Sequence, residues 1–338
     1  MRDGREILSS VIASQIDLHR PWGGVVPELA SREHLAKIEP IVAGALGQAG
    51  CELSEIDAIA VTQGPGLIGS LLVGVCYAKA LAWSLDIPIV GVNHIEGHVH
   101  SVVFENPPIE YPALALIASG GHTNIFHLPE PGRYEVVSRT RDDAAGEAFD
   151  KVAKMLGLGY PGGPIIEELA LEGDATRVRF PIAKISDGTL DLSFSGLKTA
   201  VSRYLSDNPA DMNGGPGRQH RDVAASFQAA VVTSLVRTLE KLAVQFSPRT
   251  LIVAGGVACN LALRQATQKV GERRNIPVYF PSKHLSTDNA AMIAAAGYLH
   301  LRTGHSADLR FTADISMRLQ NVEKSEPNMD GRRVRYRL

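Results

Sequence analysis

Residues 113–126 read ALALIASGGHTNIF, an apolar run that breaks at Ser119-Gly120-Gly121-His122 and then resumes. The simplest interpretation is a buried strand, a tight turn and a second strand, because paired glycines supply the positive φ that such a turn needs. Residues 251–260, LIVAGGVACN, form another apolar run that reaches paired glycines, and a helical pattern follows it. These two runs predict a sheet whose strands end at glycine turns.

Strands and helices alternate along most of the chain, which predicts an α/β fold with helices packed on sheets. A glycine-proline turn is expected at 160–164, and the polar stretch 206–219 is expected to be a surface loop. The other expected strands lie at 7–16, 57–62 and 87–92, and the expected helices lie at 27–47, from the glycine loop 64–70 to about 83, and at 144–156.

The composition is that of a globular protein with two medium-sized domains. Of the 338 residues, 45% are hydrophobic and 21% are charged, and the net charge is −2. No apolar run approaches the roughly 20 residues that cross a bilayer, and the first residues do not resemble a signal peptide, so we expect a cytoplasmic protein with no membrane contact. Near-neutral charge argues against a protein that coats nucleic acid by itself, but it allows a nucleic-acid substrate. The basic segment 332–337 is expected to be a solvated tail.

The run His94-Ile95-Glu96-Gly97-His98 places two imidazoles four positions apart. On a helix they share one face and can hold one metal ion, whereas Glu96 points roughly 200° away around the axis. In zinc peptidases the acid directly follows the first histidine, so this pattern lacks a peptidase base. The same spacing also occurs on solvated helix faces, so this run alone leaves both interpretations open.

Asp288 is the best candidate for a third metal ligand. It lies directly before the small-residue run 290–297, AAMIAAAG, which reads as a helix. An Asp at that place is also an ordinary N-cap, so both interpretations stay open.

The glycine loops favour a nucleotide site, although glycine pairs also occur in ordinary turns. Gly64-x-Gly66-x-x-Gly69 matches the dinucleotide fingerprint, but the next strand ends without the acidic residue that this fold requires. The chain contains no P-loop motif. The glycine pairs at 120–121 and 255–256 fit the nucleotide cleft of the actin, sugar-kinase and heat-shock ATPase (ASKHA) superfamily.

Seven motifs in this order closely resemble the tRNA N6-adenosine threonylcarbamoyltransferase family, once described as O-sialoglycoprotein endopeptidases. The resemblance extends from about residue 23 to about residue 308 and is far more specific than any single motif. The motifs are 94–98 (HIEGH), 119–123 (SGGHT), 142–151 (DDAAGEAFDK), 160–164 (YPGGP), 193–199 (SFSGLKT), 254–257 (AGGV) and 286–289 (STDN).

The resemblance implies a two-lobed actin-like fold of ribonuclease-H-like repeats, with a nucleotide cleft between the lobes. It implies transfer of threonylcarbamoyl from threonylcarbamoyl-AMP to N6 of adenosine 37, in tRNAs that read codons beginning with A. His94, His98 and Asp288 would hold one divalent metal ion, Fe²⁺ first and Zn²⁺ second. The residues that would line the adenylate pocket are Ile117, Ala118, Ser119, Gly120, Gly121, Asp150, Gly163, Glu167 and Asn260.

Glu167 stands where relatives often carry Asp, which keeps the carboxylate but lengthens its reach. The resemblance also implies partners: tRNA, a degenerate paralogous subunit and a small ATPase. The expected division is an N-terminal lobe at 1–108, a C-terminal lobe with a helical insert at 109–287, a helix that returns to the first lobe at 288–304, and a tail at 305–338.

Relatives begin with a strand and a phosphate-facing loop that precede the strand expected here at 7–16. About 15 to 20 residues, by ordinary hairpin dimensions, are therefore expected to be missing before Met1, which we interpret as an internal or misassigned start. Three alternatives remain open: a metallopeptidase, a truncated paralogue that binds partners without catalysis, and a sugar-kinase-like enzyme, which would share the fold but not His94 and His98.

Overall fold

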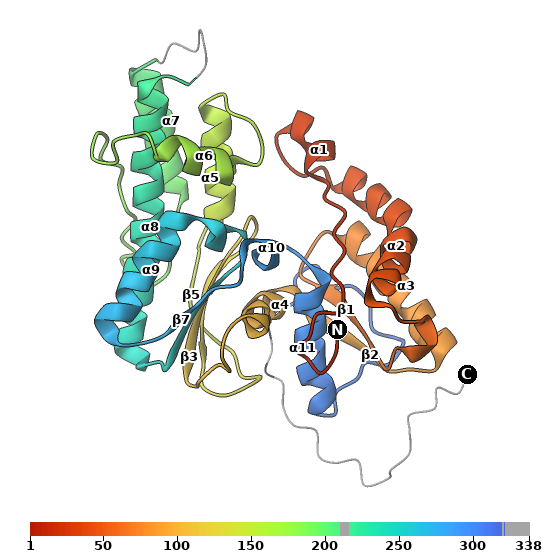
Figure 1. Cartoon of the computed structure of the whole chain (residues 1–338). Coiled ribbons are helices and arrows are strands. Elements are labelled where there is room, and N and C mark those ends of the chain that lie inside the picture. Colours follow the sequence, from red (N-terminus) through yellow and green to blue (C-terminus); the bar gives the residue numbers. More distant parts are fainter. Residues whose placement is uncertain (210–215, 320, 322–338) are drawn as a thin grey trace.

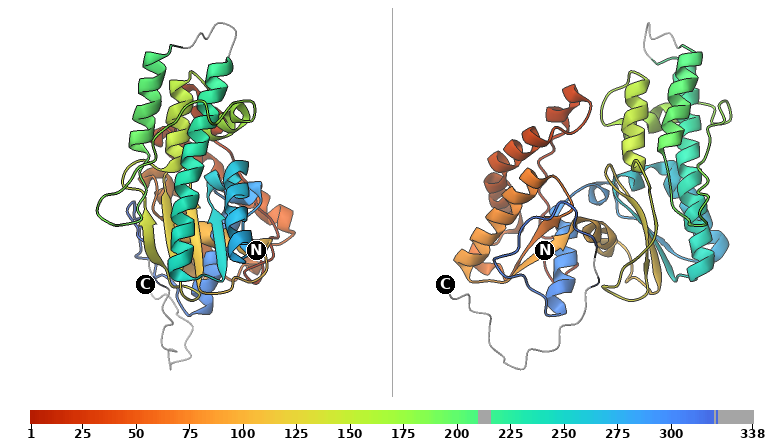
Figure 2. Two further views of the ribbon diagram at one scale, coloured as in Figure 1. Left: turned by 90° about the vertical axis from the view of Figure 1, so that its left-hand side faces the viewer. Right: turned by 180° about the vertical axis from the view of Figure 1, so that it is seen from behind.

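The computed structural model describes residues 1–338 except 210–215, 320 and 322–338. The basic segment 332–337 and the middle of the predicted loop 206–219 lie outside the described residues. Figure 1 shows two groups of elements, one built around β1 and β2 and the other around β3 to β7. Figure 2 shows the same two groups from the side and from behind.

The first sheet consists of β1 (Ile59–Gly64) and β2 (Ile89–Asn93), which run parallel. The crossover between them is α3 (Ile68–Leu85), and α2 (Pro27–Ala49) lies beside α3. Side chains alternate between the two faces of a strand. Ile89 packs with α3, whereas Val90 and Val92 pack with α11 (Ala290–Arg302), so the two helices cover opposite faces of this sheet.

The second sheet has the order β5-β4-β3-β6-β7. The predicted hairpin is confirmed: β3 (Ala113–Ala118) pairs antiparallel with β4 (Thr123–Leu128), while β6 (Thr250–Ala254) pairs parallel with β3. The positive φ expected in its turn is wrong, because neither Gly120 nor Gly121 has one. The edge strands are β5 (Glu135–Arg139) and β7 (Val278–Tyr279).

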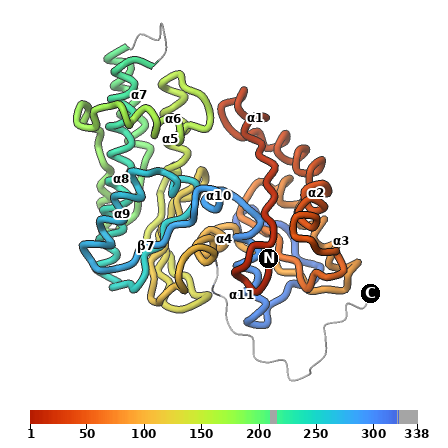
Figure 3. The backbone as a smooth tube through the Cα atoms, in the orientation of Figure 1, coloured from red at the N-terminus to blue at the C-terminus, as the bar shows by residue number. Residues whose placement is uncertain are grey.

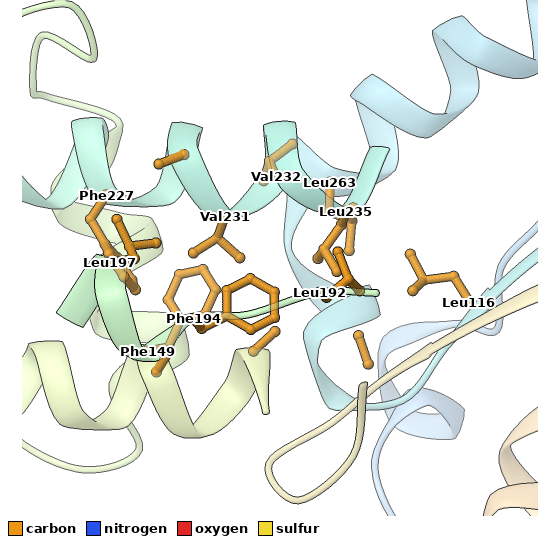
Figure 4. Packing of buried hydrophobic residues seen from close by; sticks show 14 of the residues in the cluster. Leu116, Phe149, Leu192, Phe194, Leu197, Phe227, Val231, Val232, Leu235 and Leu263 are labelled. Atoms are coloured by element: carbon orange, nitrogen blue, oxygen red, sulfur yellow. The ribbon is translucent and has the colours of Figure 1, made fainter. Parts of the chain in front are cut away.

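The two faces of β3 belong to two different cores. Leu114 and Leu116 face the larger core, together with the aromatic pair Phe149 and Phe227, whose rings lie 5.2 Å apart (Figure 4). Ala115 and Ile117 face a second core that includes residues of α4 (His94–His100). The helices that pack around the larger core are α5 (Ala145–Met155), α6 (Gly162–Ala170), α7 (Ser195–Asp207), α8 (Arg218–Phe246) and α9 (Leu261–Arg274).

Short helical segments complete the described chain. They are α1 (Ile16–His19), η1 (Arg20–Trp22), η2 (Leu53–Glu55), η3 (Ser101–Phe104), η4 (Gly256–Cys259) and α10 (Lys283–Ser286). The first residues pass over α11 (Figure 3). Gly4 lies against the ring of Tyr298 in this helix, and the Arg5 guanidinium donates to the carbonyl oxygens of Val103 and Asn106.

The predicted strand at 7–16 is wrong. Within the described residues this segment forms no ladder with β1 or β2, and α1 already begins at Ile16. A β-strand forms only where its backbone hydrogen-bonds to a neighbouring strand, so the apolar composition of this segment was not enough to predict one. The predicted turn at 160–164 also differs, because α6 begins at Gly162. A Cβ there would lie 2.7 Å from the Cα of Asp150, which shows how closely α6 approaches α5.

One described helix, α3, is long and apolar enough to span a membrane by length and composition, with a mean hydropathy of 1.5. It packs on β1 and beside α2, and its Lys79 donates to the carbonyl oxygen of Phe311. These contacts are those of a crossover helix in an α/β lobe.

Candidate functional site

The helix α4 begins directly at the end of β2, where Asn93 caps it. The Asn93 side chain accepts a hydrogen bond from the Ile95 amide at 2.9 Å. This start places His94 in the first turn and His98 one turn later, on the same face. His98 is completely buried, and the His94 side chain is 17% exposed.

Asp288 joins the two histidines although it lies 190 residues further along the chain. Its Oδ1 is 3.5 Å from Nε2 of His94 and 3.4 Å from Nε2 of His98, and ligand atoms of the three residues lie within 4.8 Å of one another. The cap of α11 is the next residue, Asn289, whose side chain accepts from the Met292 amide and donates to the carbonyl oxygens of Leu285 and Thr287. Asp288 is therefore not the cap and is free to face the imidazoles.

The donor atoms fit a divalent metal ion. Both ring nitrogens of His98 are buried, and apart from the 3.4 Å contact of Nε2 with Asp288 neither has a polar partner among the described residues. Burial lowers the pKa of His94 to about 4. Desolvation acts to raise the pKa of Asp288, but the imidazoles of His98 and His94 offset it and bring that pKa to about 2. At neutral pH the group therefore offers a neutral imidazole and an ionised carboxylate, which a metal ion requires.

Glu96 is turned away from this group, as the helical geometry predicts, but it is buried instead of solvated. It is 2% exposed, and its carboxylate binds the Tyr134 hydroxyl and Nε2 of His300, each at 2.9 Å. Both oxygens have partners on the far side of α4, so Glu96 cannot act as the base of a metallopeptidase.

His122 is a neighbour of the metal group that the sequence pattern did not single out. Its ring centroid lies 6.3 Å from that of His94, and burial, followed by His98, lowers its pKa. It directly follows Gly121 in the turn between β3 and β4, and this position next to the paired glycines could have indicated a site residue. The histidine brings the glycine turn next to the candidate metal ligands.

The glycine turn itself is held by close backbone packing. A Cβ on Gly146, at the start of α5, would lie 2.6 Å from the carbonyl oxygen of Ser119, and one on Gly255 would lie 2.4 Å from that of Ala118. Gly255 also has a φ of +90°. Gly120 and Gly121 are exposed, and their amides donate to no described residue, so they can receive an anionic group.

Two of the predicted pocket residues cannot offer their side chains to a ligand. Ile117 and Ala118 are completely buried in the two cores on either side of β3. An alternating strand directs its side chains into both layers, so the side chains of Ile117 and Ala118 serve the two cores.

The remaining predicted pocket residues lie around α5, α6 and α9. The Asp150 carboxylate accepts from the Gly162 amide at 2.7 Å, and burial raises its pKa. Gly163 faces open space, with no atom within 4 Å of a Cβ placed there. Glu167 accepts from the Leu261 amide at 2.5 Å.

Asn260 has a structural function as the cap of α9. Its side chain accepts from the Leu263 amide at 3.0 Å and donates to the Gln228 side chain at 2.6 Å. Both Glu167 and Asn260 thus bind amides at the start of α9, a function that the pocket prediction did not include, although Asn is a preferred residue at a helix N-cap.

Known proteins are similar in sequence to nearly the whole chain. The family model for tRNA N6-adenosine threonylcarbamoyltransferase matches residues 6–295. The enzyme of that name from Clostridium perfringens is 50% identical over 317 residues, which cover 94% of this chain and 93% of the relative. The one from Symbiobacterium thermophilum is 51% identical over 310 residues, or 92% and 89% of the two chains.

Solved structures show the fold. HypF from T. kodakarensis has a TM-score of 0.61 at 14% identity, and full-length HypF in a phosphate- and nucleotide-bound form has 0.55 at 15%. The matches cover 79% and 78% of this chain but only 44% and 41% of those longer chains. The chain thus has an α/β fold similar to that of part of HypF. The chain belongs to the tRNA N6-adenosine threonylcarbamoyltransferase family and transfers threonylcarbamoyl to adenosine 37 of tRNA.

Proposed function

We propose that the reaction takes place between the metal group His94, His98 and Asp288 and the glycine turn 119–121, with threonylcarbamoyl-AMP as donor. The observation that carries this proposal is the position of His122, whose ring lies 6.3 Å from His94 and which directly follows the turn. A donor whose phosphate meets the turn therefore has its carbamoyl end within reach of the metal group.

In the reaction, N6 of the adenosine bonds to the carbonyl carbon of the donor, the bond from that carbon to the phosphate oxygen breaks, the N6 proton is lost and AMP leaves. A metal ion held by the three residues would supply Lewis-acid polarisation of a carbonyl or phosphate oxygen. The amides of Gly120 and Gly121 would bind the phosphate, and the carboxylates of Asp150 and Glu167 would accept from hydroxyl groups of the nucleoside.

The direct test is threonylcarbamoyl transfer from synthetic threonylcarbamoyl-AMP to tRNA that reads codons beginning with A. Asp288→Ala should lose transfer and metal binding together, while AMP binding persists. For the pocket, Glu167→Ala should weaken AMP binding, whereas its exposed neighbour on α6 provides the matched control Glu168→Ala. Wild-type transfer by Asp288→Ala after dialysis against a chelator would refute the metal part of the proposal.

The metal ion that we propose is Fe²⁺, with Zn²⁺ as the alternative. Two imidazoles and one carboxylate suit both ions, because neither requires a thiolate. Elemental analysis of protein purified without oxygen decides between them, and a stoichiometric zinc content without iron would contradict the proposal.

We further propose that α2 and α3 provide the surface for the paralogous subunit. Large apolar side chains are exposed on both helices: Leu35 is 69% exposed, Ile68 50% and Trp83 58%. Exposed apolar groups on two adjacent helices are typical of a protein–protein interface. Leu35→Glu should prevent a complex with the co-expressed paralogue in analytical ultracentrifugation, and an unchanged complex would contradict this assignment. We also propose that a small ATPase is a partner and that the protein is cytoplasmic.

A further inference from the structure

Four polar side chains form a buried cluster behind the metal group: Glu96, Tyr134, His100 and His300. One carboxylate oxygen of Glu96 accepts from the Tyr134 hydroxyl and the other contacts Nε2 of His300, each at 2.9 Å. Nε2 of His100 lies 2.9 Å from the Tyr134 oxygen. Glu96 is 2% exposed and Tyr134 6%. The proposed reaction uses none of these groups.

The members of this cluster come from three separate parts of the chain. Glu96 and His100 belong to α4, Tyr134 precedes β5 at the second sheet, and His300 lies in the last turn of α11. The helix α11 begins two residues after Asp288. The Glu96 carboxylate therefore connects the helix that carries two candidate ligands to the helix that follows the third ligand, and to the second sheet.

Hydrogen-bond donors in the cluster can be assigned. Burial, and after it the Glu96 charge, raises the pKa of Tyr134 well above 10, so the phenol keeps its hydrogen. That hydrogen is donated to Glu96. The contact with His100 is then made by the Nε2–H of the imidazole, which donates to the phenol oxygen. Each polar atom of the Glu96–Tyr134 pair thus has a partner, which a buried carboxylate requires.

Close packing beside Glu96 makes the position of α4 sensitive to this cluster. A Cβ on Gly97 would lie 2.8 Å from Cδ1 of Ile293 and 3.1 Å from Cγ of Met292, so α4 and α11 touch directly. On the other side, Ile95 and Val99 pack with Tyr134 in the second core. The helix α4 is held between α11 and the second sheet, and Glu96 is the one residue of this helix that hydrogen-bonds to both through its side chain among the described residues.

We propose that Glu96 is a positioning residue: its carboxylate, bound by Tyr134 and His300, fixes α4 between α11 and the second sheet and so sets the distance from His94 and His98 to Asp288. The effect on the metal ligands rests on the proposed metal site, whereas the role of Glu96 in holding α4 in place is independent of that site. The two parts can therefore be measured separately.

The first measurement is amide hydrogen exchange of α4 in the metal-free protein. Glu96→Ala and Tyr134→Phe should each accelerate exchange of the α4 amides by about tenfold or more, as expected for a helix that opens locally. Glu96→Gln is the conservative variant. The glutamine side chain can accept a hydrogen bond from the Tyr134 hydroxyl and donate one to the His300 imidazole when its Nε2 carries no hydrogen, so this variant should keep most of the protection of α4 against exchange. The matched control is Glu110→Gln, an exposed glutamate that pairs with Arg249.

The second measurement is Co²⁺ binding, followed by the visible absorption of the bound ion. Glu96→Ala should weaken binding by about 10–100-fold, the range for groups that orient metal ligands, and should change the absorption spectrum. Glu96→Gln and Glu110→Gln should resemble the wild type. Asp288→Ala should lose the absorption without faster exchange of α4.

These outcomes separate the two ideas. If the wild type binds Co²⁺ no better than Asp288→Ala, the proposed metal site is wrong. Hydrogen exchange alone then tests whether Glu96 holds α4 in place. If Glu96→Ala and Tyr134→Phe leave the exchange of α4 unchanged, the positioning proposal is overturned whatever the metal data show. Faster exchange with unchanged Co²⁺ affinity would overturn the link between the anchor and the ligands.

Discussion

The substitution Gly146→Ala tests whether the glycine turn depends on its contact with α5. A Cβ at this position would lie 2.6 Å from the Ser119 oxygen, 2.8 Å from the Ser119 carbonyl carbon and 2.9 Å from the Cα of Gly120. All three are backbone atoms, so no side chain can turn aside. The Gly146 amide also donates to the Ser119 oxygen at 3.1 Å, and the added methyl group would force the two chains apart.

The magnitude follows from this geometry. Because ordinary contacts begin near 3.4 Å, the turn would have to shift by several tenths of an ångström. Overpacking of this kind costs about 1–3 kcal/mol of stability. A displaced donor of hydrogen bonds to phosphate should also weaken AMP binding, by about tenfold for each 1.4 kcal/mol lost.

The matched control is Gly196→Ala. Gly146 and Gly196 are each the second residue of a helix, but Gly196 is exposed and nothing lies within 4 Å of a Cβ there. The control should be neutral or more stable by up to about 1 kcal/mol, because alanine favours the helix. Chemical denaturation and calorimetric AMP titration provide the two readouts. Equal stability and equal AMP affinity of the two variants would refute the reasoning.

Three further predictions concern the same site. Asn289→Ala removes the cap of α11 and should cost about 0.5–2 kcal/mol in chemical denaturation together with weaker Co²⁺ binding; intact Co²⁺ affinity would show that the cap does not position Asp288. The Arg264 guanidinium donates to the carbonyl oxygens of Ala258 and Pro281, and Arg264→Lys removes this pair of hydrogen bonds. The variant should bind AMP more weakly in calorimetry while its circular dichroism spectrum stays that of the folded protein. Unaltered AMP binding would contradict this prediction. Burial raises the pKa of Asp150 in the folded protein, so the contribution of this group to stability is complete below its ordinary pKa and is lost as the pH rises through the folded value. The free energy of unfolding of Asp150→Asn should therefore increase relative to that of the wild type between pH 4 and pH 7. A difference that stays constant over this range would contradict the prediction.

Local sequence patterns predicted most of the elements that carry the site. The hairpin at 113–128, the strand that ends at Gly255 and the long helix from Pro27 all follow from hydrophobic periodicity and glycine placement within a few residues. The spacing of His94 and His98 likewise predicted a shared helix face. Such features depend on neighbours in sequence, which explains why they could be recognised.

Contacts between distant segments could not be predicted in this way. The hydrogen bond between His300 and Glu96 joins residues 204 positions apart. At the start of α11, two adjacent polar residues could each have been the cap, and the structure shows that Asn289 is the cap and Asp288 is not. The segment 7–16 has strand-like composition, yet pairing depends on a neighbour that its own residues do not specify. Sequence alone therefore identified Asp288 as a candidate ligand but left its alternative function open.

The five residues from His94 to His98 show how helix geometry separates a metal-binding helix from a peptidase helix. The two histidines share one face, Glu96 points to the opposite side and binds Tyr134 and His300, and Gly97 allows contact with α11. A zinc peptidase would carry its acid at position 95. Here that position is Ile95, which is 4% exposed and packs with the second core. An acid placed there would lose its hydration among apolar side chains before it could reach a metal-bound water, so the packing of α4, and not only the order of its residues, excludes the peptidase mechanism.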